Sequence, residues 1–194
     1  MKYSKRQLQI INTAIKIINT EGIRKLTTKY LAQKVGVTEP ALYRHFKNKN
    51  SILYSILDYF ETVSNTVLQA NSNDNVNSID NIQKFVLDRY NLFSENPDLA
   101  KIMFSDSFLS EDPILSEKMF HIMHHHSVAI IKTIEEGQKT NEITNEILSI
   151  DLFRMIFGSL RLLTTQWISS NYSFNLIQEG KRLWLSIKKL ICKI

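Results

Sequence analysis

The sequence predicts an all-α protein with a small basic module at residues 1–48 and a larger helical body at residues 49–194. The 194 residues include five glycines and three prolines, so few positions would interrupt a helix. Apolar residues recur at three- and four-residue steps, and no stretch of useful length alternates as a strand would. Residues 1–50 carry eleven Lys and Arg against two acidic residues, whereas acidic residues outnumber basic ones in the remainder.

The basic module is expected to hold three helices. The first covers about residues 4–20, where apolar residues recur at helical spacing, and Gly22 ends it. The second covers "TTKYLAQKV", with Thr27 or Thr28 as its cap and Gly36 at its end. Thr38 can cap the third helix, whose first turn accommodates a proline.

The body is expected to add six helices, about nine in all. A fourth helix begins at Asn48 and runs to about residue 69, and the asparagine-rich stretch 70–80 follows as a linker. Asn96 and Asp112, each followed by a proline, mark two further helix starts, the second opening a long helix over about 113–138. The last two helices are expected from Ser149 and Ser173.

A helix, a glycine turn and a second short helix form a helix-turn-helix, in which the second helix enters the DNA major groove. Arg44 can fork onto guanine, Ala41 can contact a thymine methyl group, and Glu39 can accept from a cytosine amine. Three further side chains would lie at the rim, near the phosphates: Tyr43, His45 and Lys49. Leu42 and Phe46, four residues apart, are expected to form the buried side of this helix. The basic module is therefore predicted to bind a double-stranded DNA operator.

The stretch "LTTKYLAQKVGVTEPALYRHFKNKNSIL" resembles the DNA-binding signature of the tetracycline-repressor (TetR) family of bacterial transcription factors, over about residues 8–55. The resemblance implies a homodimer with an N-terminal DNA-binding domain and a C-terminal domain that binds a small-molecule effector. By position, it implies phosphate or backbone contacts from Thr28, Tyr43, His45 and Lys49, and base contacts from Lys29, Glu39, Pro40, Ala41 and Arg44. With Thr38, these residues make up the predicted DNA-binding set.

Apolar stripes on the last two helices suit a four-helix dimer interface, although they could instead fill the core of the subunit itself. The predicted dimerisation residues are Leu160, Trp167, Leu176, Leu183, Trp184 and Ile187. Aromatic and methionine residues are dense between the linker and these helices, which suits an adaptable apolar cavity. The residues expected to contact an effector are Phe93, Met103, Phe104, Phe120, Met123 and Phe157.

These features predict a transcriptional repressor that a small apolar or amphipathic effector releases from a palindromic operator. One alternative is a helical DNA-binding or interaction protein without an effector. Another is a metal-responsive regulator, because His121 and His125 lie four residues apart. No enzyme and no cofactor are expected, since the chain lacks a Gly-rich phosphate loop and the sequence signatures of hydrolases.

The cellular location is expected to be the cytoplasm. Cys192 is the single cysteine, so no intrachain disulfide can form, and a reducing compartment is favoured. The opening residues do not resemble a signal peptide, and no apolar run is long enough to span a bilayer.

Overall fold

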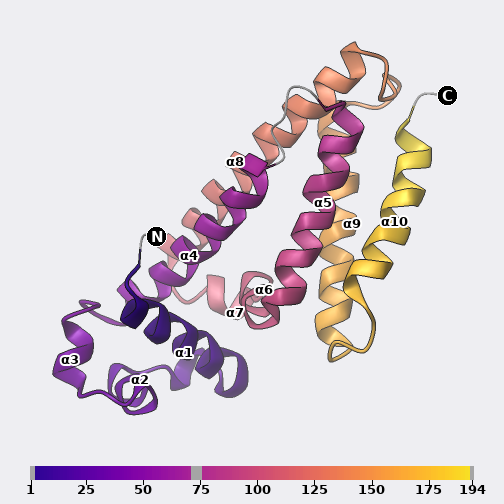
Figure 1. Ribbon diagram of the computed structural model, residues 1–194. Helices are drawn as coiled ribbons and strands as arrows, with labels where there is room; N and C mark the ends of the chain where they lie inside the picture. Colours follow the sequence, from indigo (N-terminus) through magenta and orange to yellow (C-terminus); the bar gives the residue numbers. More distant parts are fainter. Residues whose placement is uncertain (1–2, 71–75, 193–194) are drawn as a thin grey trace. The chain divides into compact units, whose positions relative to one another are not determined.

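The computed structural model describes residues 3–70 and 76–192, and these form α-helices joined by short turns (Figure 1). In this part of the chain the helices number ten, and a single 3₁₀ turn, η1 (Ile23–Lys25), joins the first two. The helices are α1 (Lys5–Glu21), α2 (Thr28–Val35), α3 (Glu39–Tyr43), α4 (Lys49–Ala70), α5 (Ser78–Glu95), α6 (Pro97–Met103), α7 (Asp106–Leu109), α8 (Pro113–Lys139), α9 (Ser149–Ser169) and α10 (Leu176–Ile191). The all-α prediction is confirmed.

Differences from the predicted elements are local. The additional helix is α7, whose four residues are too few to show a helical period in the sequence. Helix α10 begins three residues later than predicted, because Asn175 accepts a hydrogen bond from the Gln178 amide and so sets its start. The predicted linker 70–80 is only partly testable: α5 already begins at Ser78, and residues 71–75 lie outside the described part.

The chain divides into two compact units. Unit 1 comprises Met1–Thr62 and Asp98–Phe120, and unit 2 comprises Val63–Pro97 and His121–Ile194. Unit 1 therefore contains the whole predicted basic module, together with the first part of α4 and a later segment from α6 to the start of α8. Helices α4 and α8 each contribute residues to both units.

The core of unit 1 is built on the isoleucine-rich face of α1. A capping box starts this helix: Ser4 accepts from the Gln7 amide, and the Gln7 side chain accepts from the Ser4 amide. Ile10 and Ile11 are fully buried, as are Leu31 of α2 and Leu42 of α3. These apolar contacts hold the three helices of the module together.

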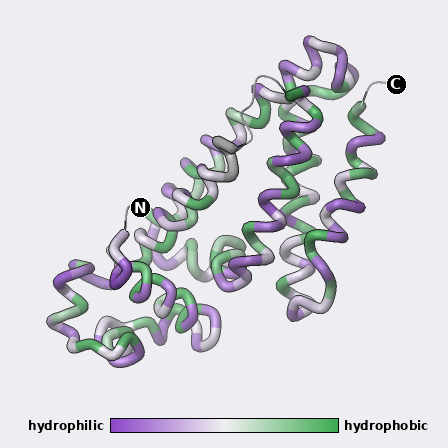
Figure 2. Tube along the Cα trace, in the orientation of Figure 1, coloured by the Kyte–Doolittle hydropathy of each residue, from purple (hydrophilic) through white to green (hydrophobic). Residues whose placement is uncertain are grey.

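Unit 2 is organised around α5, α9 and α10, which pack on one another side by side (Figure 1). Along α10, hydrophobic and hydrophilic residues alternate at helical spacing (Figure 2), which leaves one face for the core. Gly180 of α10 lies so close to the Tyr90 ring of α5 that a Cβ atom would overlap it, at 2.4 Å. The indole Nε1 of Trp184 donates to Gln83 Oε1 at 2.8 Å, which fixes the same two helices.

Within the described ranges, no helix is both long enough and apolar enough to cross a membrane.

Candidate nucleic-acid interface

The turn between α2 and α3 depends on Gly36. Its backbone is left-handed, with φ 77° and ψ 37°, a conformation that costs glycine little and other residues more. The Gly36 amide donates to Gln33 O at 3.2 Å and the Val37 amide donates to Ala32 O at 3.0 Å, so the turn satisfies the last carbonyls of α2. This pairing fixes the direction in which the chain leaves α2.

Helix α3 is five residues long and is anchored by its apolar side. Thr38 caps it, accepting from the Ala41 amide at 3.4 Å. Leu42 is fully buried and Phe46, in the turn that follows, is 5% exposed, as the sequence predicted. Tyr43, Arg44 and His45 lie between these anchors and are exposed. The helix therefore offers its polar side chains to solvent from a fixed base.

Hydrogen bonds link the start of α2 to α3. Thr28 Oγ1 donates to Glu39 Oε1 at 2.5 Å and lies 3.3 Å from Tyr43 Oη. Three members of the predicted DNA-binding set are thus held together on one side of the module. The set as a whole lies in unit 1 and none of its members is buried: Thr28, Glu39, Ala41 and Lys49 are half-buried, and Lys29, Thr38, Pro40, Tyr43, Arg44 and His45 are exposed.

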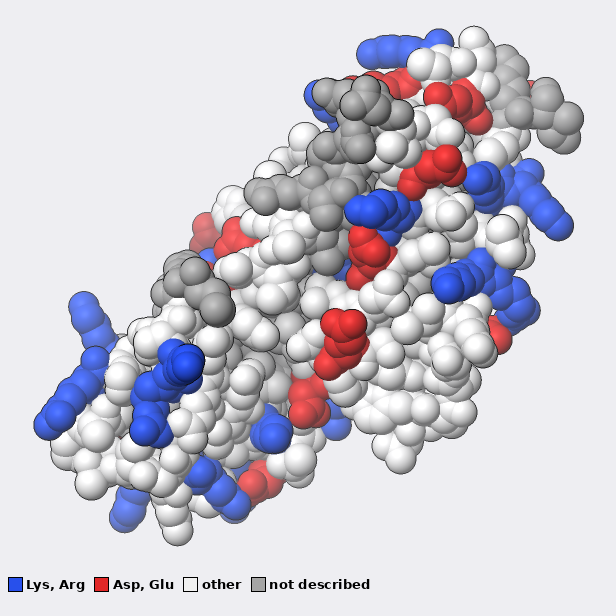
Figure 3. All heavy atoms as spheres, viewed as in Figure 1, with Lys and Arg blue, Asp and Glu red and all other residues white. Residues whose placement is uncertain are grey.

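Cationic side chains stand around the end of unit 1 that α1, α2 and α3 form (Figure 3). Residues 1–50 supply eleven of the 24 Lys and Arg residues of the chain. A surface of this sign attracts a polyanion such as DNA, and it does so independently of base sequence.

Lys49, at the first position of α4, is paired with an acid that sequence reasoning did not single out. Its Nζ lies 2.7 Å from Glu111 Oε1, and both side chains are about one-third exposed. Such a pair is worth little in water, about 0.2–1 kcal/mol. A DNA phosphate could therefore displace the carboxylate at modest cost.

The next residue, Asp112, holds the start of α4 in a second way. Its Oδ1 accepts from the Ile114 amide and so caps α8, as predicted. Its Oδ2 accepts from Asn50 Nδ2 and from Tyr54 Oη, each at 2.8 Å. The hydrogen bond to Asp112 is the main cause that raises the pKa of Tyr54, so this phenol stays protonated.

Nearly two turns further along α8, Lys118 ties the same two helices together. Its Nζ lies 2.5 Å from Asp58 and 3.5 Å from Glu61, both on α4. Burial disfavours the charged form of Lys118, but the hydrogen bond and charge of Asp58 outweigh it, and the pKa of Lys118 is raised. Within unit 1, residues 111–118 thus brace the helix that follows the helix-turn-helix.

Two family models match the chain. One, described as bacterial regulatory proteins of the tetR family, matches residues 10–56, and the other, described as the C-terminal region of YsiA-like protein, matches residues 54–191. This chain belongs to the TetR family. It is accordingly a DNA-binding transcriptional regulator with a helix-turn-helix.

Known proteins are similar to this TetR-family member over nearly its whole length. The nucleoid occlusion factor SlmA of Actinobacillus pleuropneumoniae is 26% identical over 192 residues, which span 95% of this chain and 92% of that protein. The fatty acid degradation regulator FadR from Bacillus halodurans has a TM-score of 0.83 at 16% identity, over 97% of both chains. FadR from Bacillus subtilis, solved in complex with stearoyl-CoA, has a TM-score of 0.78 at 18% identity, over 93% of this chain and 96% of that one. The structural likeness shows a shared fold.

The predicted dimerisation residues do not all lie where a partner could reach them. Leu160, Trp167, Leu176 and Trp184 are at most 6% exposed and pack inside the subunit, because they occupy the inner faces of α9 and α10. Leu183 and Ile187 are half-buried. Leu160, Trp167, Leu176 and Trp184 thus lie in the core of the subunit itself, which is the alternative placement that the sequence left open.

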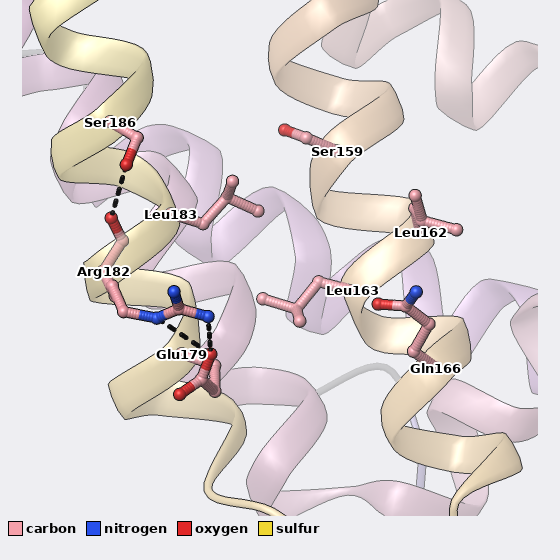
Figure 4. A pocket seen from close by; sticks show the side chains of 8 residues that line it. All are labelled: Ser159, Leu162, Leu163, Gln166, Glu179, Arg182, Leu183 and Ser186. Atoms are coloured by element: carbon pink, nitrogen blue, oxygen red, sulfur yellow. Dashed lines mark hydrogen bonds and ion pairs between the residues drawn. The ribbon is translucent and has the colours of Figure 1, made fainter.

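A different apolar set is exposed on the same two helices. On α9 and the residue before it, Leu148, Met155 and Leu162 recur every seven residues, and Leu162 is 60% exposed. Leu190, 68% exposed, stands on α10 on the side of Leu183 and Ser186. Between the helices is a hollow of about 280 Å³, across which Leu163 and Leu183 point toward each other (Figure 4). We call these exposed residues and the hollow the outer α9–α10 face.

The residues predicted to contact an effector are divided between the units. Met103, Phe104 and Phe120 belong to unit 1, and Phe93, Met123 and Phe157 belong to unit 2. Phe93 and Met103 are buried, whereas Phe120 is 67% exposed. Phe157 is half-buried and stacks on Phe153, with ring centroids 5.2 Å apart. Their contact with an effector stays a prediction.

The histidine run on α8 separates into two kinds. His121, His124 and His125 are exposed, whereas His126 is 1% exposed. Across residues 3–70 and 76–192, no group of three or more His, Cys, Asp or Glu side chains is arranged to hold a metal ion.

Replacing Arg44 and Lys49 should separate base recognition from phosphate contact. Arg44→Ala is expected to weaken binding to the preferred duplex by about 1–3 kcal/mol. The difference in affinity between this duplex and a scrambled one should therefore become smaller. Lys49→Ala should weaken binding to both duplexes about equally. Fluorescence anisotropy with a duplex obtained by selection in vitro measures both effects. An unchanged preference in Arg44→Ala would contradict the assignment of base contacts to this residue.

Removing the charge of Glu111 should free Lys49 for a phosphate. Glu111→Gln is expected to tighten binding to any duplex by up to about fivefold at low salt, the range of an exposed ion pair. Glu95→Gln, an exposed acid of unit 2, makes the same change in net charge and serves as the control. If the two variants bind DNA equally, Glu111 does not compete with phosphate.

Proposed function

We propose that this protein represses transcription as a homodimer on a palindromic operator and that a small amphipathic effector releases it. The observation that carries the proposal is the arrangement of α2, Gly36 and α3. Buried Leu42 and Phe46 anchor a short helix whose exposed Arg44 can reach base edges. Tyr43, His45 and Lys49 would contact the phosphates beside it.

Residues 1–48 would act as the DNA-binding domain and residues 49–194 as the effector-binding and dimerisation domain. A regulator of this kind works where the bacterial chromosome lies, so we propose the cytoplasm as its location. Its function needs no enzymatic activity and no cofactor.

The outer α9–α10 face is the proposed dimer interface. An exposed apolar stripe of this length is unusual on a monomer and is better explained by a partner surface. TetR-family regulators act as dimers, and the same face of a second copy presents the same exposed apolar side chains beside the polar lining of the hollow. A two-fold axis through this face would present two recognition helices to a palindromic site.

Release by an effector requires that the effector bind the free and the DNA-bound conformations with different affinity. Glu111, Asp112 and Lys118 supply a route between the two sites, since they bind the first half of α4, which follows the DNA-binding module. A change in the position of α8 would alter these contacts and, with them, the orientation of α4. The complex of Bacillus subtilis FadR with stearoyl-CoA supports effector binding in this fold.

A second candidate function is DNA binding without a small-molecule effector. The similarity to nucleoid occlusion factors over 92–95% of both chains favours it. The two candidates differ in distribution on the chromosome: a repressor occupies few promoters, whereas a nucleoid occlusion factor would occupy many dispersed sites. Mapping the bound sites by chromatin immunoprecipitation distinguishes them.

Charging the outer α9–α10 face should separate the subunits. Leu162→Glu is expected to yield folded monomers in analytical ultracentrifugation and to weaken binding to a two-half-site operator by on the order of 100-fold, because the second half-site is lost. Val128→Glu changes an exposed apolar residue of α8 and serves as the control, which should remain dimeric. A monomeric wild type, or a dimeric Leu162→Glu, would refute the interface.

A further inference from the structure

Unit 2 contains four polar side chains that belong to three different helices. Ser64 and Asn65 lie on α4, Arg89 on α5 and His126 on α8. Arg89 Nη1 donates to Ser64 Oγ, and His126 Nε2 lies 3.2 Å from Asn65 Oδ1. Ser64, Arg89 and His126 are each at most 2% exposed. We call these four residues the polar cluster.

Arg89 places a positive charge among aromatic rings. Its Cζ lies 5.1 Å from the ring centroid of Phe85 and 6.0 Å from that of Phe93, and both phenylalanines are buried. Burial lowers the pKa of Arg89 to about 10, which still leaves the guanidinium charged at neutral pH. Cation–π contact compensates part of the cost of burying this charge.

His126 adds a neutral group that can form a hydrogen bond. Burial is the main cause that lowers its pKa to about 3, and the charges of Arg89 and His125 lower it further. Its Nδ1 atom is buried and has no hydrogen-bond partner among the residues that the structure describes. While Asn65 Oδ1 faces Nε2, Nε2 carries the proton and Nδ1 has a lone pair. When the Asn65 amide is turned over, its nitrogen donates to Nε2, and Nδ1 carries the proton and can donate to a ligand.

Stability alone gives little reason for these side chains. Arg89 lies four residues from Phe85 and from Phe93, and His126 lies four residues from the buried Ile122 and Ile130. Both therefore occupy positions on apolar helix faces where an aliphatic side chain would pack. Replacing a buried charge by an apolar residue of similar volume is often neutral or stabilising. The polar groups at these positions call for a role in binding.

We propose that the polar cluster binds the carboxylate of an amphipathic effector, with Arg89 as its cation. With the Asn65 amide turned so that its nitrogen donates to Nε2, His126 Nδ1 is a second hydrogen-bond donor. This inference rests on the proposed effector-dependent function and adds to it the chemical class of the effector. One cation beside a neutral imidazole matches a single negative charge, and a guanidinium can bind a carboxylate through two parallel hydrogen bonds. Phe85 and Phe93 would contact the apolar part of the molecule.

A pair of probes that differ only in the head group tests the proposal. Dodecanoate and dodecanol have the same alkyl chain, and each is titrated into the purified full-length protein below the concentration at which it aggregates. Isothermal titration calorimetry is expected to give a dissociation constant at least tenfold lower for dodecanoate, because a charged hydrogen bond is worth about one to two powers of ten in affinity.

Two variants and a control assign the selectivity to the cluster. Arg89→Met should abolish the preference for dodecanoate while leaving dodecanol binding unchanged, and His126→Gln should reduce the preference in part. Lys132→Met removes an exposed cation from α8, where the side chain is 77% exposed, and should have no effect. If Arg89→Met does not fold, Arg89→Lys replaces it. Lysine cannot bind a carboxylate through two parallel hydrogen bonds, so the affinity for dodecanoate should fall while that for dodecanol stays the same.

Three results would overturn the inference. The first is equal binding of both probes to the wild type, and the second is no binding of either probe. A third is an Arg89→Met variant that keeps the preference for dodecanoate. Operator binding without probe is measured on the same samples, so that the two proposals can fail separately. If the wild type does not bind the operator, the proposed function is refuted. If it binds the operator but has equal affinity for the two probes, only the carboxylate site is refuted.

Discussion

The fixed angle between α2 and α3 is the constraint on which the rest of the structure's function depends. A five-residue helix has too few hydrogen bonds to be stable alone. Gly36 sets its direction, and Leu42 and Phe46 bury its inner side against the core of unit 1. Exposed Tyr43, Arg44 and His45 consequently stand on a base that does not have to be ordered when DNA binds, which saves conformational entropy at that step.

The second constraint is the hold that residues 111–118 have on α4. Glu111 forms an ion pair with Lys49, and Lys118 forms one with Asp58. Asp112 accepts hydrogen bonds from Asn50 and Tyr54. Each contact is polar and partly exposed, so each is weak by itself and open to competition. An arrangement of this kind suits regulation, because small changes in free energy can shift a balance between two positions of α4. Apolar packing at the same place would hold the helix more firmly and respond less.

Sequence reasoning could predict the helix-turn-helix because its signals are local. Glycine in a left-handed turn, a threonine cap and two apolar residues four apart each depend on neighbouring residues only. Which apolar residues of α9 and α10 face outward was harder to predict, because Trp184 and Leu162 both belong to apolar stripes and only tertiary packing decides which stripe faces inward. Glu111 was missed since its partner is 62 residues away. The position of Arg89 could have been noticed in the sequence, because a charged residue lies four residues from Phe85 and four from Phe93, on the apolar face of the same helix.

The salt dependence of operator binding tests the central claim, that a cationic helix-turn-helix unit binds DNA through its phosphates. The dissociation constant is measured by fluorescence anisotropy between about 50 and 200 mM salt, the range over which phosphate contacts weaken most visibly. The logarithm of the association constant should fall linearly with the logarithm of salt concentration, by about 0.9 for each phosphate contacted. Several contacts per half-site give a steep slope. A slope near zero would contradict the account.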